Sequence, residues 1–338
     1  MITSHDVAKL AGVSQPTVSR ALRDVPGVSM QTRSRVRDAA RALGYVPSQA
    51  GRSLSTRTTG RIGIVSDQLA NPFYPALVDP LHQRLAECGY RTILVVDHGQ
   101  DEVAIETLVD GSLDGVILTT SELSSELPLE LSRRGMPSVL VNRLVKGSTV
   151  DECTADDAHG AGLVADLFVG LGHRRIAAIF GPQTTSTGRA GAEGFRSRLQ
   201  VMNVDLPESM VRTGPFTTEH GAHALATLLN CSERPTAIFC ANDVVAMGAL
   251  NTAVTHGLRV PEDLSIVGFD DIPMASWARL NLTTVHAGID ELARTAADMI
   301  LARIKHPESP QRSHVEPVRL VLRGTHAPPP RHTPPLIA

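Results

Sequence analysis

The feature that most constrains the fold is an alternation of short apolar runs with amphipathic segments, which occurs in two consecutive sets after Arg61. Short buried strands that alternate with helices predict parallel sheets covered by helices on both faces, so two sets predict two α/β subdomains. A helix at 289–303 and a strand at 318–322 are expected to cross back between them. The predicted strands lie at 62–66, 92–96, 115–118, 138–142, 175–180, 210–213, 237–240 and 265–269, and the predicted helices at 75–88, 103–109, 127–134, 159–170, 191–202, 219–229 and 244–256.

The residues before this alternation predict a separate helical domain. Thr3 and Asp6 have the spacing of a capping box, and Gly12 allows a sharp turn because glycine tolerates positive φ. Ser14 is expected to cap a second helix at 15–22. A third helix follows, with residues expected to cap it and end it at Ser29 and Gly44.

The second helix has an apolar side and a polar side. We expect it to pack through Val18, Ala21 and Leu22 against the apolar side of the first helix, which is formed by Val7, Ala8, Leu10 and Ala11. The polar side consists of Gln15, Pro16, Thr17, Ser19 and Arg20. A helix–turn–helix of this kind places its second helix in the major groove of DNA. Periodicity alone is equally compatible with an ordinary helical hairpin.

The charge distribution distinguishes the two parts of the chain. The first 61 residues contain ten Lys and Arg and three Asp, a net charge of +7, whereas the whole chain carries −3, which leaves −10 on the remainder. A basic domain on an acidic body indicates that the first part alone contacts phosphates. A solvated charged face explains a helix rich in arginine, but not the scarcity of acids across the whole segment.

The wording from Asp6 to Leu22, DVAKLAGVSQPTVSRAL, resembles the LacI/GalR (lactose-repressor) family of bacterial transcription regulators, and the resemblance continues to about residue 326. It implies a ligand-responsive repressor that binds a palindromic operator in double-stranded DNA as a homodimer. Base edges would be read by Gln15, Pro16 and Arg20, and the remaining expected DNA contacts are Thr3, Ser14, Thr17, Ser19 and Arg52.

The linker at 47–60 is small, polar and basic, and the resemblance implies a hinge helix there. By position, Leu54 would be the leucine that enters the minor groove and kinks the duplex, as an apolar wedge does. Gly51 stands where the family commonly has alanine, which should disfavour the helix by about 0.5–1 kcal/mol. The alternative is that Leu54 is an incidental residue of the linker.

The resemblance also implies a periplasmic-binding-protein-like core with two parallel, Rossmann-like lobes around a small effector. We expect a helix–turn–helix domain at 1–46, the hinge at 47–60, and a core for effector binding and dimerisation at 61–326. The first lobe would comprise about 61–160 and 290–317, and the second about 161–289 and 318–326, before a disordered proline-rich tail at 327–338. The tail lacks leucine heptads, which favours a dimer over a tetramer.

Ligands of parallel sheets gather at the carboxyl ends of the strands. Polar and aromatic residues follow these ends, and planar polar groups with an aromatic face suit a sugar or sugar derivative. A purine or a partner protein is the alternative. The expected effector contacts are Phe73, Tyr74, Arg189, Phe216, Asn242, Asp270 and Trp277. The alternative, purely structural roles are a core position for Phe73 and helix capping for Asp243 and Asp271.

One position departs from the family pattern. The family usually has an arginine four residues before the aromatic of a Gly-aromatic pair, here Gly194-Phe195, but this chain has Gly191 there. Either Arg189 reaches the cleft in its place, or the effector lacks the group that the arginine normally binds.

No catalytic set, metal site or cofactor motif emerges. Neither GxxxxGK[ST] nor GxSxG occurs, and nothing completes a metal site beside His220 and His223. The four cysteines lack CxxC spacing and are expected to be buried free thiols. Without a signal peptide or a long apolar run, a cytoplasmic protein is expected, away from membranes. The competing functions are a solute-binding transport protein and a sugar- or nucleoside-processing α/β enzyme that uses Asp270 or Asp271.

Overall fold

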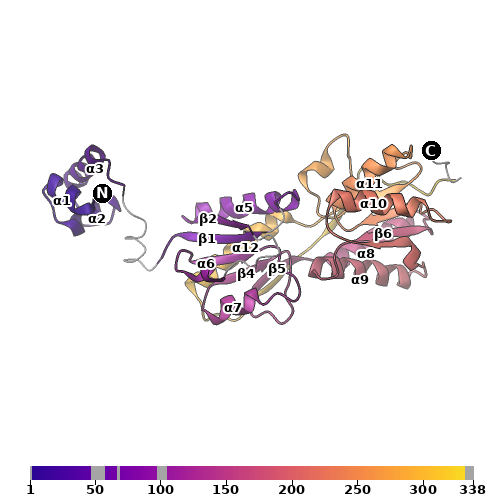
Figure 1. Ribbon diagram of the computed structural model, residues 1–338, viewed down its shortest axis with the longest axis horizontal. Coiled ribbons are helices and arrows are strands. Elements are labelled where there is room, and N and C mark those ends of the chain that lie inside the picture. Colours follow the sequence, from indigo (N-terminus) through magenta and orange to yellow (C-terminus); the bar gives the residue numbers. More distant parts are fainter. Residues whose placement is uncertain (1, 47–57, 67–68, 97–104, 332–338) are drawn as a thin grey trace. The chain divides into compact units, whose positions relative to one another are not determined.

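The computed structural model describes residues 2–46, 58–66, 69–96 and 105–331 (Figure 1). The chain divides into an N-terminal unit, Met1–Thr59, and a C-terminal unit, Gly60–Ala338. Each unit has its own apolar core and is described by itself.

The N-terminal unit contains α1 (Ser4–Ala11), α2 (Gln15–Leu22) and α3 (Met30–Leu43). The local signals act as predicted. The Thr3 backbone N–H donates to Asp6 Oδ2 over 2.8 Å, Ser14 Oγ accepts from the Thr17 N–H over 3.4 Å, and Gly12 and Gly44 end their helices with φ of 63° and 62°. Short-range chemistry therefore sets the bounds of all three helices.

The core of the N-terminal unit is small and comes from all three helices. Leu10, which the pattern assigned to the apolar side of α1, is 56% exposed, so that prediction is wrong. The buried positions of α1 follow one another at intervals of one and three residues and share one side of the helix. Leu10 lies on the other side, which faces solvent. The buried side chains are Val7, Ala8, Ala11, Val18, Ala21, Val36, Ala39 and Ala40.

The first lobe of the C-terminal unit is a six-stranded parallel sheet in the order β11-β5-β4-β3-β1-β2. Alternate residues of the central strands point to opposite faces. Ile62 and Ile64 pack with α5 (Phe73–Glu87) and α12 (Ile289–Lys305), whereas Val65 packs with the side of α6 (Ile105–Val109) and α7 (Leu127–Arg133). The strands are β1 (Arg61–Ser66), β2 (Arg91–Val96), β3 (Gly115–Leu118), β4 (Ser138–Val141), β5 (Asp151–Ala155) and β11 (Ser313–Glu316).

The second lobe is a four-stranded parallel sheet in the order β7-β6-β8-β9, with short helical turns η1 (Glu208–Met210) and η2 (Pro273–Ser276) on its connections. α8 and α9 pack against each other, and so do α10 and α11 (Figure 1). The strands are β6 (Ile176–Phe180), β7 (Val211–Thr213), β8 (Ala237–Cys240) and β9 (Ser265–Val267), and the helices are α8 (Asp157–Gly170), α9 (Ser186–Val201), α10 (Thr218–Leu229) and α11 (Asp243–Thr255).

Three segments cross between the lobes. One joins β5 to α8, a second joins β10 (Thr284–His286) to α12, and a third joins β11 to β12 (Arg319–Val321). The sequence pattern did not predict β5, β10 or β11, because these strands are short and mostly polar or isolated. The strand predicted at 318–322 is present as β12, but it pairs antiparallel with β10 outside both parallel sheets.

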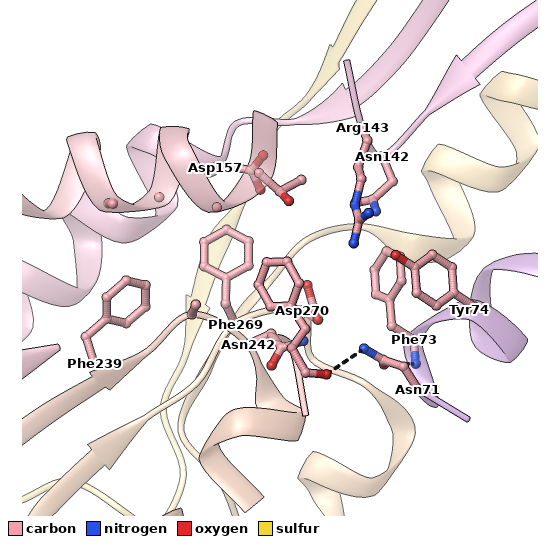
Figure 2. A pocket seen from close by; sticks show the side chains of 16 residues that line it. Asn71, Phe73, Tyr74, Asn142, Arg143, Asp157, Phe239, Asn242, Phe269 and Asp270 are labelled. Atoms are coloured by element: carbon pink, nitrogen blue, oxygen red, sulfur yellow. Dashed lines mark hydrogen bonds between the residues drawn. The ribbon is translucent and has the colours of Figure 1, made fainter. Parts of the chain in front are cut away.

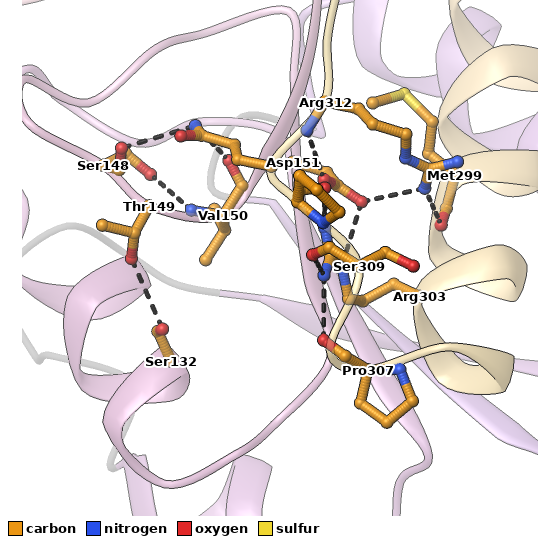
Figure 3. A network of polar contacts seen from close by, with 12 residues as sticks. Ser132, Ser148, Thr149, Val150, Asp151, Met299, Arg303, Pro307, Ser309 and Arg312 are labelled. Carbon is orange, nitrogen blue, oxygen red and sulfur yellow. Dashed lines mark hydrogen bonds and ion pairs between the residues drawn. The ribbon is translucent and has the colours of Figure 1, made fainter.

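A buried carboxylate holds the edge of the first lobe together (Figure 3). Asp151, at the start of β5, is fully buried and accepts from Arg303 Nη2 over 2.7 Å and from Arg312 Nη2 over 2.9 Å. The backbone N–H of Arg312 also donates to Asp151, over 2.8 Å. One side chain therefore joins the end of α12 and the segment before β11 to the sheet.

The end of the chain differs from the expectation at residues 327–331. The backbone N–H of Ala327 donates to Ser265 Oγ over 3.0 Å, and its carbonyl pairs with buried His173 Nε2 over 2.8 Å. The second lobe thus continues past residue 326, and the rest of the predicted tail, 332–338, lies outside the described residues. Cys153 and Cys240 are buried as expected, but Cys88 is exposed. Among the described helices, none has the length and apolar character needed to cross a membrane.

Candidate functional site

The polar side of α2 is open to solvent, as its pattern predicts. Gln15, Pro16 and Arg20 are exposed, and Thr17 and Ser19 are partly exposed. Gln15 Nε2 donates to Ser4 Oγ over 3.1 Å, which holds its amide at the N-terminal end of α2. In helix–turn–helix proteins bound to DNA, the N-terminal end of the second helix contacts base edges.

Several of the arginines that account for the positive charge are already paired within the N-terminal unit. Arg33 and Arg37 both contact Asp24, over 3.3 and 2.7 Å, and Arg41 contacts Asp38 over 2.7 Å. Arg20 makes no ion pair with any residue that the structure describes. Two of the expected DNA contacts, Arg52 and Leu54, lie outside the described residues.

A cavity lies where the two lobes face each other (Figure 2). It occurs at the carboxyl ends of the strands, as the topology of parallel sheets predicts. Figure 2 shows first-lobe side chains on one side and second-lobe side chains on the other. It is lined by Asn71, Phe73, Tyr74, Asn142, Arg143, Asp157, Thr187, Gly188, Gly191, Ala192, Phe216, Phe239, Ala241, Asn242, Phe269 and Asp270.

Part of the first-lobe wall is built by the residues at the start of α5 and just before it. Asn71 Oδ1 accepts from the Phe73 N–H over 3.0 Å, and Asn71 Nδ2 donates to the Phe216 carbonyl of the second lobe over 3.4 Å. Phe73 and Tyr74 meet edge to face at 5.3 Å and are almost fully buried. These two rings therefore line the cavity and belong to the core, so the two roles weighed for Phe73 coexist.

The second-lobe wall contributes Asp157, Asn242 and Asp270. Asn242 Oδ1 caps α11 by accepting from the Val245 N–H over 2.9 Å, which leaves its amide nitrogen for a ligand. Burial raises the pKa of Asp157 to about 8 and raises the pKa of Asp270 well above its ordinary value, to which the neighbouring carboxylates Asp243 and Asp157 also contribute. The charged form of both carboxyls is therefore disfavoured at this wall of the cavity.

The predicted capping roles of Asp243 and Asp271 are wrong. Asp243 is buried and accepts from Thr284 Oγ1 and from the Ile272 N–H, over 2.5 and 2.9 Å. Burial raises the pKa of Asp243 to about 7. Asp271 forms an ion pair with Arg323 over 2.6 Å. Both carboxyls are bound by residues far along the chain, and Asn242 caps α11.

Two of the seven expected effector contacts do not line the cavity. Arg189 is exposed, and its Nη2 donates to the Gln183 carbonyl over 3.2 Å. Trp277 is 59% exposed and follows η2 on the surface. The other five, Phe73, Tyr74, Phe216, Asn242 and Asp270, meet in the cavity.

Sequence reasoning missed Arg143 and Asp157. Arg143 directly follows Asn142 at the carboxyl end of β4, and Asp157 is the first residue of α8, where the first crossing ends. The position after a strand was a usable signal for Arg143. No local signal marked Asp157, because its place in the cavity depends on how the two lobes meet.

The lobes contact each other around the cavity. The Leu123 N–H donates to the Thr184 carbonyl over 2.9 Å, and the Leu144 N–H donates to Ser186 Oγ over 2.8 Å. Thr184 Oγ1 also donates to Glu122 over 3.0 Å. These contacts join the first lobe to the N-terminal end of α9, so a ligand in the cavity would touch both lobes at once.

The known proteins that are similar to this chain identify its family. A family profile described as bacterial regulatory proteins, lacI family, matches residues 3–48, and one described as periplasmic binding protein-like domain matches residues 165–326. The chain is 35% identical to the HTH-type transcriptional repressor PurR of Photorhabdus laumondii, over 96% of each protein. It is 33% identical to the ribose operon repressor of Escherichia coli, over 96% of this chain and all of that protein.

This chain belongs to the lacI family of bacterial regulatory proteins. It is therefore a DNA-binding transcription regulator, and the transport-protein and enzyme alternatives are not favoured. Solved structures of the family share its architecture. A Lac repressor dimer bound to operator and the anti-inducer ONPF superposes with a TM-score of 0.86 at 25% identity, over 96% of this chain and 99% of that one. The regulator CelR in complex with cellobiose is 30% identical with a TM-score of 0.73, over 96% of this chain and all of that one.

Proposed function

We propose that this LacI-family regulator is a cytoplasmic, homodimeric repressor whose operator affinity changes when a small sugar or sugar derivative occupies the cavity between the lobes. The observation that carries the proposal is that cavity, in which amide groups from both lobes and carboxyl groups of the second lobe converge beside aromatic rings. Sugars are bound by such planar polar groups with an aromatic face against the ring. Related structures are described with bound cellobiose and bound ribose, which supports this effector class.

The operator would be read by the exposed side of α2. Arg20 would contact a guanine, Gln15 a further base edge, and Pro16 an apolar group such as a thymine methyl. Thr3, Ser14, Thr17 and Ser19 would contact the phosphate backbone, with Arg52 as a further DNA contact. Leu54 would kink the centre of a near-palindromic site. In this proposal the domain boundaries are the predicted ones: a helix–turn–helix domain at 1–46, a hinge at 47–60, and the core from 61 onward.

A homodimer is supported by the edge of the first lobe. β2 is the last strand of the sheet, and three of its apolar side chains, Ile93, Leu94 and Val96, are exposed to solvent in the described chain. An exposed apolar edge strand is a natural surface for a second chain. Two copies would place two α2 helices on the two halves of a palindrome.

Replacing Arg20 with alanine should weaken binding to the preferred operator by about 1–3 kcal/mol, because one guanine contact is lost. The operator would be selected by the wild-type protein from random duplex DNA, and affinities would be measured by fluorescence anisotropy on that site and on unrelated DNA. Arg41→Ala is the matched control, since Arg41 is already paired with Asp38. Equal losses on both DNAs would exclude base reading by Arg20.

Effector binding would be tested by thermal shift of the whole chain with sugars, sugar phosphates, purines and nucleosides. A ligand at 100 times its Kd should stabilise the protein by about 2.7 kcal/mol. Asp270→Ala is expected to weaken that ligand about tenfold to hundredfold, because a hydrogen bond to a carboxyl is lost, while operator binding without ligand stays intact. Asp205→Ala, on the exposed surface of the second lobe, is the control. An undiminished response in Asp270→Ala would remove Asp270 from the site.

A further inference from the structure

The guanidinium of Arg143 is buried at the cavity with most of its hydrogen-bonding capacity unused. The residue is 3% exposed, its Nη1 donates to the Thr120 carbonyl over 3.0 Å, and its Nε finds no partner among the described residues. Its central carbon lies 5.8 Å from the centre of the Phe216 ring. A guanidinium has five N–H donors and stays charged, so this site needs an acceptor that the protein does not supply.

The acidic groups of the cavity do not provide that acceptor. Neither Asp157 nor Asp270 forms an ion pair with Arg143 in the described chain. Burial raises the pKa of both carboxyls and so disfavours their charged forms. A carboxyl can adapt to burial by taking up a proton, but a guanidinium cannot adapt by losing one. Arg143 is therefore the fixed charge of this cavity.

A helix N-terminus adds to the positive potential beside Arg143. The residue after it, Leu144, donates its backbone N–H to Ser186 Oγ in the first turn of α9, over 2.8 Å. Thr187 and Gly188 of the same turn line the cavity. The N-terminal end of a helix favours negative charge and offers backbone donors. Gly191, one turn later, leaves open space where a side chain would stand.

We propose that Arg143 and the first turn of α9 form an anion subsite, so the effector carries a phosphate or carboxylate group: a sugar phosphate or a sugar acid. This inference rests on the proposed role of the cavity as the effector site. It also explains how the chain can lack the family's usual arginine at Gly191, because Arg143 of the opposite lobe then supplies the positive charge and Arg189 does not. Binding of the anion would join the two lobes, since Arg143 belongs to the first and α9 to the second.

The test uses pairs of probes that differ in the anionic group. D-ribose 5-phosphate is compared with D-ribose, D-glucose 6-phosphate and D-glucuronate with D-glucose, and D-gluconate with D-glucitol, by thermal shift and calorimetry on the full chain. We expect the charged member of at least one pair to bind more tightly than its neutral partner. A phosphate that succeeds where a carboxylate fails, or the reverse, identifies the group.

Substitutions at two arginines show which side chain is responsible for the tighter binding of the charged probe. Arg143→Gln should weaken the charged probe about tenfold to hundredfold, the value expected for a lost charged hydrogen bond, and Arg143→Lys should weaken it less. Arg189→Gln, which removes the exposed arginine, should bind like the wild type. Operator binding by each variant shows that it is folded, and Arg143→Lys serves if Arg143→Gln is not.

The outcomes separate this inference from the proposed function. Two results would overturn the anion subsite while leaving a sugar effector in place: tighter binding of a neutral sugar than of its charged partner, or a charged probe whose affinity does not change when Arg143 is replaced. Failure of every charged and neutral probe would overturn both. Loss of the charged probe's advantage in Arg143→Gln, with Arg189→Gln unaffected, would support both.

Discussion

Replacing Asp151 with alanine is expected to lower the free energy of unfolding of the C-terminal unit by about 3–5 kcal/mol, the usual result of breaking a buried ion pair on one side. Asp151 is fully buried between Arg303 and Arg312. Burial acts to raise the pKa of Asp151, but the hydrogen bonds from the two arginines outweigh it and lower that pKa. The carboxylate is therefore charged in the native state, and its removal leaves two guanidinium groups without their partner.

Urea unfolding, followed by the emission of Trp277, measures this effect. Trp277 is the sole tryptophan and lies in the C-terminal unit, so the signal reports that unit. Asp166→Ala is the matched control, because Asp166 pairs with Arg198 on the surface, where such pairs contribute about 1 kcal/mol or less. A loss for Asp151→Ala as small as that of the control would show that the network does not stabilise the lobe.

Replacing Phe195 with alanine is expected to destabilise the second lobe by about 3–5 kcal/mol, because a large cavity would replace a fully buried ring. The ring stacks on Phe239 at 4.7 Å between centroids and meets Phe180 and Phe168 edge to face at 6.2 and 6.4 Å. Phe239 also lines the cavity between the lobes. Truncation of Phe195 should therefore loosen one wall of that cavity as well as the core.

The same urea titration tests this prediction, with effector affinity as a second readout. Val201→Ala is the control on the same helix, since Val201 is 69% exposed and its loss should change stability by about 0.5 kcal/mol or less. Phe195→Leu should fall between the two, because it keeps most of the buried volume. If Phe195→Ala unfolded at the urea concentration of the wild type, the cluster would have relaxed to fill the space.

The sequence by itself determined the elements whose causes are local. Five of the six ends of the three N-terminal helices follow from Thr3, Ser14, Ser29, Gly12 and Gly44, each acting on backbone within about one turn. The central strands of both parallel sheets are buried apolar runs, and the cavity at their carboxyl ends follows from parallel topology. The wording of α2 was specific enough to indicate the family.

Only the tertiary structure decided which side chains meet. The Nε of Arg143 has no hydrogen-bond partner among the described residues, and Asp157 lies in the cavity, because of how the two lobes approach each other. Arg189 and Trp277, close to the cleft in the sequence pattern, point elsewhere. Asp151 is charged because Arg303 and Arg312, about 150 residues away, reach it. Helix caps and turns act over a few residues. The burial of a side chain, the pKa of a carboxyl and the hydrogen-bond partners of an N–H group depend on residues that the fold brings from far along the chain.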